Sequence, residues 1–484
     1  MSDRHDNTYL LISGIFLRLL GVIYLIAFAS IGVQIDGLIG SQGILPIAAR
    51  LDELAQTGDI ELFLQVPTLF WIDASDATLI GATIAGCLAA VLILLNIGQR
   101  AALIAAFILY LSLFHAAQPF LNFQWDALLL ESGFLAMFLT PRSRVVIWLF
   151  RWLLFRLRFM SGLSKLASGD PAWSGLVALD TYFEVQPLPN PVAWYVHQWP
   201  EWLLKAGTIG TLFVELLVPF MMFLPRRWRF TAAWLTIFWQ VLIIITSNHN
   251  WINFLTIILC LFLFDDRAIS RILPGFMQTR LQLQAAGDKQ VDRLIPVAVG
   301  VLALAIFTVG TLKLVELGSG HRFSGITGKV LDFTTAYSVV NKYHVFPTMT
   351  RKRIELEILG SHNGLDWQPY QFKYKPQQLD RRPAFILPHQ PRLDWQMWFV
   401  TLHPKHLPWF DRFLQALLAG SPGVSKLLAH DPFADNPPRF LRVEAYEYHF
   451  TRKDERERNG RWWKRTALGP FTPLPWMERR EIAD

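Results

Sequence analysis

The sequence predicts a polytopic α-helical membrane bundle of about nine spans, followed by a β-rich extracytoplasmic soluble domain. Of its 484 residues, 52% are hydrophobic and only 17% are charged, whereas soluble domains average roughly 25% charged residues. The apolar residues gather in long runs that end near Val315, and the rest of the chain is polar. Lys and Arg concentrate in alternate loops between the runs, as the positive-inside rule requires.

Each predicted span is a run that approaches the roughly 20 apolar residues needed to cross a bilayer. Six runs are clear: Tyr9 to Val33, Thr78 to Leu95, Ala101 to Phe114, Phe230 to Thr246, Trp251 to Phe264 and Leu294 to Val315. Three more runs are weaker because of the charge they carry: Trp125 to Leu139, Val145 to Phe159 and Lys205 to Leu224. The first run is expected to be the first anchor. Basic loops at 99–100, 142–144, 226–229 and 265–293 place the N-terminus in the cytoplasm, so an odd number of spans places the end of the chain outside it.

Two domains are expected from these patterns. Residues 1–317 form the transmembrane domain, in which the segment 161–201, rich in aromatic residues and proline, forms an interfacial lid. Residues 318–484 form the soluble domain. From Gly320 onward there are 25 Lys and Arg residues against 17 Asp and Glu, so this domain could meet anionic lipid or an acidic client, or simply carry a mixed solvated surface.

Alternating side chains predict the strands of the soluble domain. Ile354, Leu356 and Ile358 alternate with charged residues, which is typical of a half-buried strand. A turn sequence follows, and Tyr370 to Tyr374 alternates again, which predicts a hairpin. A further strand is expected at 439–451 and short helices at 406–430. Together, these patterns predict that the soluble domain is a small β-sandwich with one or two helices.

Charged residues within the predicted spans are candidates for function, because charge at membrane depth is costly. They are Arg18, Asp126, Glu131, Arg151, Arg156, Arg158 and Glu215. Ion pairs between helices, such as Arg18 with Asp126 or Glu131, are the structural alternative. Asp126 and Glu131 are about 140° apart on a helix, which argues against a paired-carboxylate site. Arg151 and Arg158 share one face, which is typical of an amphipathic helix whose cations reach the headgroups.

Lys165 and the two cysteines bear on catalysis. A lysine desolvated between an apolar helix and the lid could act as a general base, or it could be an interfacial lysine that reaches headgroups. Cys87 and Cys260 both lie in apolar runs, so neither a disulfide framework nor a cysteine zinc site is expected. No phosphate-binding loop or zinc-ligand helix occurs. We therefore expect no metal site and no cofactor.

Four separated motifs hold the remaining candidate residues. They are Asn122 to Glu131, Tyr182 to Pro189, Asn248 to Thr256 and Pro388 to Trp398. The residues singled out in them, besides the acids above, are Trp125, Glu184, Pro187, Asn248, Asn250, Asn253, His389, Arg392, Asp394, Trp395 and Trp398. The structural alternatives are helix caps for the asparagines and aromatic packing with an Arg–Asp pair for the last motif.

Through these four motifs, in this order, the chain resembles the lipase maturation factor family. The resemblance implies an integral membrane protein that helps secreted or lumenal clients, such as lipases, to mature. It also implies that the soluble domain engages the client. Nucleic acid is not expected as a partner. The C-terminus would then lie in the periplasm of a bacterium, or in the lumen of the endoplasmic reticulum if the source is eukaryotic. Membrane lipids are the other expected partner.

A second, local resemblance concerns Ser161 to Leu166 and Trp173 to Gly175. These residues are similar to a stretch of vitamin K-dependent gamma-glutamyl carboxylase and its bacterial membrane relatives, in which the lysine matched by Lys165 serves as the base.

The sequence thus favours a non-enzymatic maturation factor. Its client contacts would use Trp395, Trp398, Trp462 and Trp463 if these side chains are exposed. The alternative is a membrane enzyme that acts on a lipid-soluble quinone or lipid with Lys165 as general base. A transporter ranks last, because no internal repeat is found.

Overall fold

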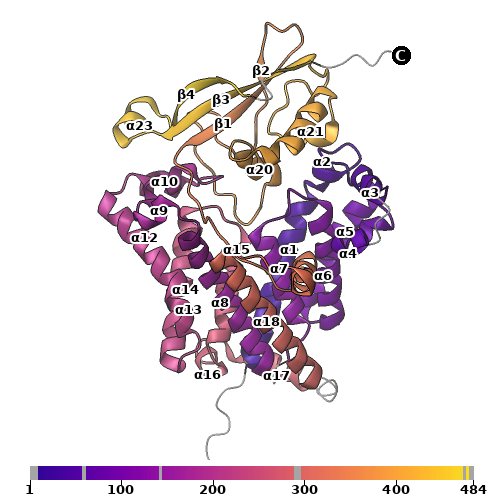
Figure 1. The fold of residues 1–484 in the computed structure, drawn as a ribbon, viewed down its shortest axis with the longest axis vertical. Coiled ribbons are helices and arrows are strands. Elements are labelled where there is room, and N and C mark those ends of the chain that lie inside the picture. Colours follow the sequence, from indigo (N-terminus) through magenta and orange to yellow (C-terminus); the bar gives the residue numbers. More distant parts are fainter. Residues whose placement is uncertain (1–8, 57–60, 141–143, 288–295, 473–475, 479–484) are drawn as a thin grey trace, which may run out of the picture.

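The computed structural model of the protein describes residues 9–56, 61–140, 144–287, 296–472 and 476–478. They are mainly helical, with a small antiparallel sheet in the last third of the chain. Figure 1 shows the long helices gathered in one bundle and the sheet placed over one end of it. The residues after 319 are called the C-terminal region below.

Five described helices are long and apolar enough to cross a membrane. They are α1 (Leu10–Gly32), α5 (Asp76–Leu95), α6 (Gln99–Ala116), α14 (Arg226–Thr246) and α18 (Pro296–Ser319). Leu294, where the last run was expected to begin, lies outside the described residues. The other expected spans fall on helices that are shorter or more charged: α7 (Gln124–Ala136), α8 (Arg144–Ala167), α12 (Glu201–Leu216) and α15 (Trp251–Leu259), which η2 (Cys260–Leu263) extends.

Short helices connect the long ones. Four lie between α1 and α5: α2 (Ile35–Ile39), α3 (Ile47–Ala55), α4 (Glu61–Gln65) and η1 (Leu69–Trp71). Three lie in the segment expected to form a lid: α9 (Pro171–Ser174), α10 (Ala178–Val185) and α11 (Pro191–His197). The first residues of that segment, 161–167, are the last turns of α8. At the end of the bundle far from the sheet are α13 (Val218–Met221), α16 (Asp266–Ile269) and α17 (Gly275–Gly287) (Figure 1).

The C-terminal region begins with α19 (Gly325–Ala336) and contains one sheet. Its strands are β1 (Arg353–Ser361), β2 (Gln368–Pro369), β3 (Phe440–Phe450), β4 (Trp463–Pro470) and β5 (Trp476–Glu478). The order is β2-β1-β3-β4, with β5 also paired to β3, and all pairs are antiparallel. The described strands therefore form a single sheet, without the second sheet of the expected sandwich. Four more helices lie here: α20 (Arg392–Val400), α21 (Leu407–Leu418), α22 (Pro422–Ser425) and α23 (Lys453–Asn459), besides the short η4 (Pro404–His406).

The expected hairpin forms, but its second strand is shorter than the alternation predicts. β2 ends at Pro369, and Tyr370 to Tyr374 is not a strand. The carboxylate of Asp394 accepts hydrogen bonds from the backbone N–H of Tyr374 at 2.7 Å and of Lys375 at 2.9 Å. Gln377 accepts the N–H of Phe372 at 3.1 Å. The side chain of Asp394, about 20 residues away, and that of Gln377, five residues away, have taken backbone donors that a longer strand would have used.

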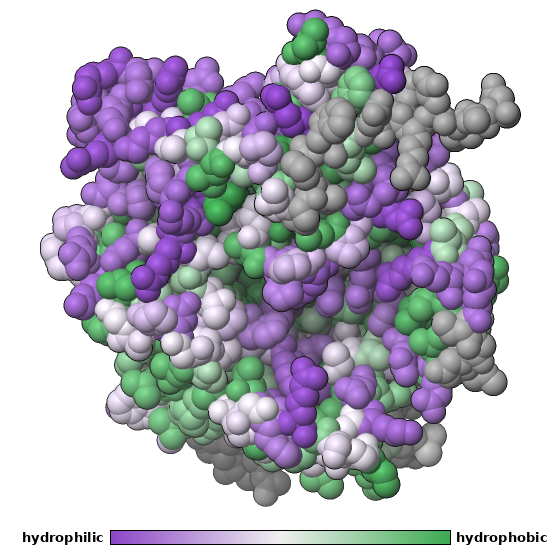
Figure 2. Space-filling model, turned by 45° about the horizontal axis from the view of Figure 1, so that its top comes forward, coloured by the Kyte–Doolittle hydropathy of each residue, from purple (hydrophilic) through white to green (hydrophobic). Residues whose placement is uncertain are grey.

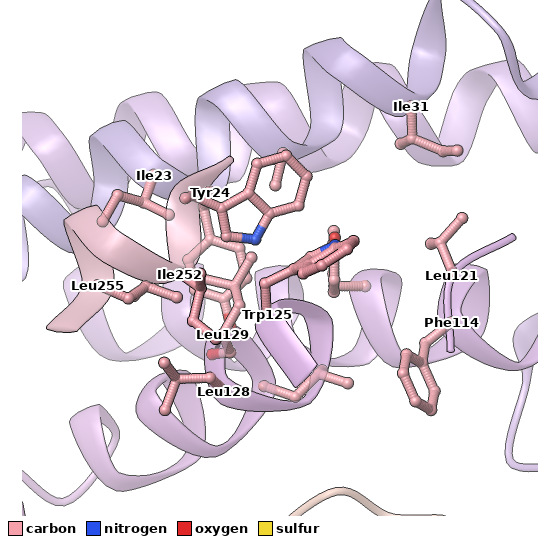
Figure 3. Packing of buried hydrophobic residues seen from close by; sticks show 14 of the residues in the cluster. Ile23, Tyr24, Ile31, Phe114, Leu121, Trp125, Leu128, Leu129, Ile252 and Leu255 are labelled. Atoms are coloured by element: carbon pink, nitrogen blue, oxygen red, sulfur yellow. Dashed lines mark hydrogen bonds between the residues drawn. The ribbon is translucent and has the colours of Figure 1, made fainter. Parts of the chain in front are cut away.

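The core of the bundle is formed where α1, α7 and α15 meet. Figure 3 shows Tyr24 of α1, Leu128 of α7 and Leu255 of α15 packed against one another, and all three are fully buried. Gly133 lets α7 approach α1, because a Cβ at this position would overlap the Tyr24 hydroxyl. The N-terminus of α1 is capped by Asp266, whose carboxylate accepts the backbone N–H of Leu10 at 2.7 Å.

The outer surface of the bundle is apolar over its membrane-spanning helices. On α14, for example, Trp234 is 61% exposed and Phe238 57% exposed. Figure 2 shows hydrophilic residues prevailing over the upper part of the face in view and hydrophobic residues gathering below them. This distribution suits a bundle surrounded by lipid beneath a solvated C-terminal region.

Candidate functional site: the joint between bundle and C-terminal region, and the cavity beside it

A buried ion pair connects α7 to α20. Arg392 donates from Nη1 to Asp126 Oδ2 and from Nη2 to Asp126 Oδ1, both at 2.8 Å, and both side chains are fully buried. The Tyr110 hydroxyl donates to the same carboxylate at 2.6 Å. The guanidinium also lies 5.4 Å from the ring centre of Trp251. Two parallel charge-assisted bonds fix orientation as well as distance, so this pair sets where the C-terminal region sits.

The end of α1 and the turn that follows it hold the backbone of the Pro388 to Trp398 motif. The backbone N–H of Gln390 donates to Ser30 Oγ at 2.9 Å, and that of Arg392 donates to Gln34 Oε1 at 2.8 Å. The Gln34 amide donates to the Gln390 carbonyl at 2.8 Å, and Ser30 Oγ lies 3.0 Å from His389 Nδ1. Sequence reasoning missed Ser30, in the last turn of α1, and Gln34, two residues after this helix ends, because neither side chain carries the charge that marks a costly residue at membrane depth.

The asparagines of the Asn248 to Thr256 motif bridge three segments. Asn248 Nδ2 donates to the carbonyls of Leu188 at 3.0 Å and Ala384 at 2.9 Å. Asn250 caps α15 through the backbone N–H of Ile252 at 3.2 Å, and its Nδ2 donates to Gln390 Oε1 at 3.0 Å. Asn250 is thus both a helix cap and a link to the C-terminal region.

The Tyr182 to Pro189 motif is attached to the sheet. Glu184 accepts the backbone N–H of Phe450 at 2.7 Å and lies 3.1 Å from His449 Nδ1. Arg353 of β1 is 1% exposed and donates to the carbonyls of Glu184 at 2.9 Å, Gln186 at 2.6 Å and Pro187 at 2.8 Å. The sequence had suggested for Arg353 only the polar face of a strand. A guanidinium that spans three carbonyls instead locks β1 onto the loop after α10.

A second buried carboxylate, Glu131, lies deeper in the bundle. It forms an ion pair with Arg156 of α8, and both side chains are fully buried. Its Oε2 accepts the backbone N–H of Asn341 at 2.9 Å, the Asn341 amide at 3.0 Å and the Tyr343 hydroxyl at 2.8 Å. The start of the C-terminal region is therefore anchored in the bundle. We call this network, together with the contacts of Asp126, Glu184, Asn248 and Asn250 described above, the joint.

Several ion pairs expected from the sequence differ from those found in the structure. Arg18 donates to the Gly14 carbonyl at 2.6 Å, while Asp126 and Glu131 pair with Arg392 and Arg156. Arg392 does not pair with Asp394, which instead accepts backbone N–H groups, as described for the hairpin. Burial raises the pKa of Asp394, and the two backbone hydrogen bonds oppose that shift.

The arginines of α8 and the tryptophans of the C-terminal region are also buried, contrary to expectation. Arg151 is 4% exposed and donates to the Phe262 carbonyl at 2.9 Å, so it does not reach headgroups. Arg158 is 6% exposed. Trp395, Trp462 and Trp463 are buried and Trp398 is half-buried. A client therefore cannot meet a surface formed by the three buried indoles, because their area is already used in packing.

A cavity of about 1260 Å³ lies beside the joint. Its walls come from α8, α12, α14 and α15, and the loop 344–350 with α20 and α21 covers it. Trp125, Asn253, Trp395 and Trp398 of the motifs line it. Asp126 and Glu131 do not line it, whereas Arg158 and Glu215 do.

Lys165 and Glu215 form an ion pair in the cavity wall. Lys165 Nζ lies 2.8 Å from Glu215 Oε2 and donates to the carbonyls of Val345 at 2.7 Å and Ser161 at 3.3 Å. Arg158 Nη2 lies 3.4 Å from the other oxygen of Glu215. An ammonium has three N–H donors, and all three have an acceptor within reach here. Over the described residues, no three His, Cys, Asp or Glu side chains gather as metal ligands would.

Comparison with known proteins finds two family domains, one over the bundle and one over the C-terminal region. The lipase maturation factor transmembrane domain matches residues 11–271, and the lipase maturation factor C-terminal domain matches residues 339–473. The chain is 33% identical to lipase maturation factor 2 of Xenopus laevis, over 96% of this chain and 82% of that protein. It is 33% identical to lipase maturation factor 1 of Homo sapiens, over 98% of this chain and 90% of that protein. No solved structure matches. With its apolar helices and these similarities, the chain is a multi-pass membrane protein that belongs to the lipase maturation factor family.

Proposed function

We propose that this protein assists the maturation of secreted client proteins, lipase-like hydrolases among them, at the membrane through which they are exported. The observation that carries the proposal is the similarity, over nearly the whole chain, to relatives named lipase maturation factor 1 and 2. The joint supports it, because a region held rigidly at the membrane can present one fixed surface to a client that has just crossed.

Client contacts belong, in this proposal, to exposed residues of the C-terminal region rather than to the four motifs. Leu365 is 81% exposed, Phe385 54% and Leu468 51%. The basic balance of the region adds attraction for acidic client surfaces. The motif residues, including Trp125, Pro187, Asn253 and His389, then have the task of fixing this surface on the bundle.

The proposed topology has nine spans, a cytoplasmic N-terminus and a C-terminal region in the periplasm or the lumen of the endoplasmic reticulum. Contacts at the two ends of the bundle support it. The beginnings of α1 and α8 meet through Tyr9 and Arg151 at 2.6 Å, and Asp266 caps α1 at the same end. The opposite ends of α1 and α8 contact the C-terminal region through Ser30 and Lys165. Nine helices alternating in this way bring the chain out on the side of the sheet.

We infer a bracing role for Lys165 rather than a catalytic one. A general base needs a free lone pair, whereas the Lys165 amine lies between two carbonyls and a carboxylate. As a brace it connects α8 to α12 and to the loop 344–350.

The proposal is tested in cells that lack their own lipase maturation factors and express a secreted lipase from the source organism of this chain. Specific activity per amount of lipase protein is measured with and without the chain. We expect the chain to raise specific activity without changing lipase synthesis, and the lipase to co-purify with it. Equal specific activity in both cells, for every secreted hydrolase assayed, would refute the proposal.

A further inference from the structure

The cavity beside the joint lies at the end of the bundle nearer the C-terminal region. Its lining from α14 runs from Trp239 to Thr246, the last two turns of that helix, and its lining from α8 runs from Leu157 to Lys165, again the last turns. Both helices end beneath the C-terminal region (Figure 1). The cavity is therefore level with the membrane leaflet that faces this region.

Exposed tryptophans mark the two edges of the membrane around it. Trp199 and Trp202, at the start of α12 and near the C-terminal region, are 49% and 69% exposed. At the other end of the bundle, Trp148 and Trp228 are 49% and 57% exposed near the starts of α8 and α14. Tryptophan collects at membrane–water interfaces. Because Trp199 also lines the cavity, the cavity reaches the headgroup level of the nearer leaflet.

The polarity of the cavity lining changes from the bundle towards the C-terminal region. The walls from α12, α14 and α15 carry most of the apolar lining, including Leu203, Leu204, Leu242, Ile243 and Ile252, beside a few polar residues such as Gln240 and Asn253. The cover contributes Lys405 and Arg412, whose side chains are exposed and form no ion pair with any described residue. The whole lining has five Lys or Arg residues against two acids, and one of those acids, Glu215, is already held by Lys165 and Arg158.

From this arrangement we infer that the cavity binds an anionic amphiphile with an acyl chain, taken from the leaflet that faces the C-terminal region. The acyl chain lies between α12 and α14, and the anionic head lies at Lys405 and Arg412. The volume exceeds the roughly 300–1,000 Å³ of a pocket for a drug-sized ligand, which fits a long chain. Uncompensated cations at one end and apolar walls at the other complement a fatty acid or an anionic phospholipid, whereas a neutral lipid or an apolar peptide would leave these cations unused.

Full-length protein in detergent is photolabelled with diazirine palmitic acid and, in vesicles of phosphatidylcholine, with diazirine phosphatidylglycerol. The labelled peptides are mapped by mass spectrometry. We expect saturable labelling of α12 and α14 that unlabelled palmitate or phosphatidylglycerol displaces and phosphatidylcholine does not. Displacement by palmitate alone identifies a free fatty acid as the ligand, and displacement by phosphatidylglycerol alone identifies a membrane phospholipid.

Two pairs of variants give the test its controls. Ile243→Trp places an indole in the cavity and should abolish labelling, whereas Ile245→Trp, two residues along α14 on the opposite side of the helix and 45% exposed outside the cavity, should not. Lys405→Glu with Arg412→Glu should weaken binding of the anionic probes about tenfold. Arg322→Glu with Lys426→Glu, exposed residues of the same region that do not line the cavity, should leave binding unchanged.

The inference fails if Ile243→Trp is labelled like the wild type, or if phosphatidylcholine competes equally and the charge variants bind like their controls. The latter result would assign the cavity to a neutral lipid or an apolar segment. All variants are first compared with the wild type by thermal unfolding, so that misfolding is not taken for lost binding. The labelling does not depend on client activity, and the proposed maturation role stands or falls separately.

Discussion

Asp126 and Arg392 lie 266 residues apart in the chain and form a bidentate ion pair. Neither side chain is exposed. One belongs to the bundle and the other to the C-terminal region. A buried pair is costly to form but more costly to break, because removal of one partner leaves the other charge uncompensated. The two parts of the chain are consequently expected to unfold together rather than as independent domains.

The same reasoning gives a prediction for Glu131. Glu131→Gln removes the charge that compensates Arg156, and the protein should lose roughly 3–5 kcal/mol of its free energy of unfolding. Tyr343→Phe removes one hydrogen bond to this carboxylate and should cost about 1 kcal/mol. Thermal unfolding of the full-length protein in detergent measures both. Glu53→Gln, at an exposed residue, is the control, and a Glu131→Gln protein as stable as this control would contradict the account.

Arg353 gives a prediction about the attachment of the sheet. Arg353→Lys keeps the charge but cannot reach three carbonyls with one ammonium in the same planar geometry. We expect β1 and the segment 184–187 to become more accessible together. Hydrogen exchange followed by mass spectrometry checks this, with Lys352→Arg as the control, because Lys352 is exposed and forms a surface ion pair with Glu447. Unchanged protection of both segments would mean that Arg353 is not what holds them.

A substitution of Lys165 distinguishes a bracing role from a catalytic one. Lys165→Met keeps the length of the side chain and removes its hydrogen bonds, so we expect lower stability together with a parallel fall in lipase-specific activity. Thermal unfolding and the lipase assay are measured on the same preparations. A variant with wild-type stability and abundance that has lost all activity would favour the enzyme alternative instead.

His249 makes stability depend on pH. It is 6% exposed, accepts or donates a hydrogen bond with the Tyr182 hydroxyl, and burial lowers its pKa to about 4. In the unfolded chain, the His249 imidazole takes up a proton near pH 6.5. In the folded protein, it takes up this proton only near pH 4. Stability should therefore be constant above about pH 6.5 and fall as the pH is lowered from there.

Melting temperatures between pH 7.5 and 5 test this expectation. His249→Gln should show a shallower decline than the wild type, whereas His430→Gln, at an exposed residue, should decline as the wild type does. His406, whose pKa burial also lowers to about 4, contributes in the same direction, so a smaller slope remains in His249→Gln. Identical slopes for all three proteins would show that His249 takes up no proton in this range.

Local patterns in the sequence predicted the elements that depend on local physics. The alternation of Ile354, Leu356 and Ile358 gave β1 correctly, and hydrophobicity located every long helix. The same alternation overextended the next strand, because Asp394 takes the backbone donors of Tyr374 and Lys375 from about 20 residues away. No local signal marks a competitor at that distance.

The buried acids of the candidate site were predictable from the sequence, but their partners were not. Charge within apolar runs singled out Asp126, Glu131 and Glu215 because burying a charge is costly wherever it occurs. The partner of each charge depends on how the helices pack, and Arg392 came from outside the bundle altogether. Arg158 was expected to reach headgroups, but it lies beside the buried carboxylate of Glu215, because helical spacing alone does not distinguish a face towards headgroups from one towards a buried carboxylate.

The coupling between Asp126 and Arg392 tests the central claim, that the motifs fix the C-terminal region on the bundle, most directly. Asp126→Asn, Arg392→Gln and the double variant are unfolded in detergent beside the wild type. We expect each single variant to be strongly destabilised and the double variant to be less destabilised than their sum, with a coupling of about 1–3 kcal/mol. Effects that add to within about 0.5 kcal/mol would show that the two residues do not interact and would contradict the account.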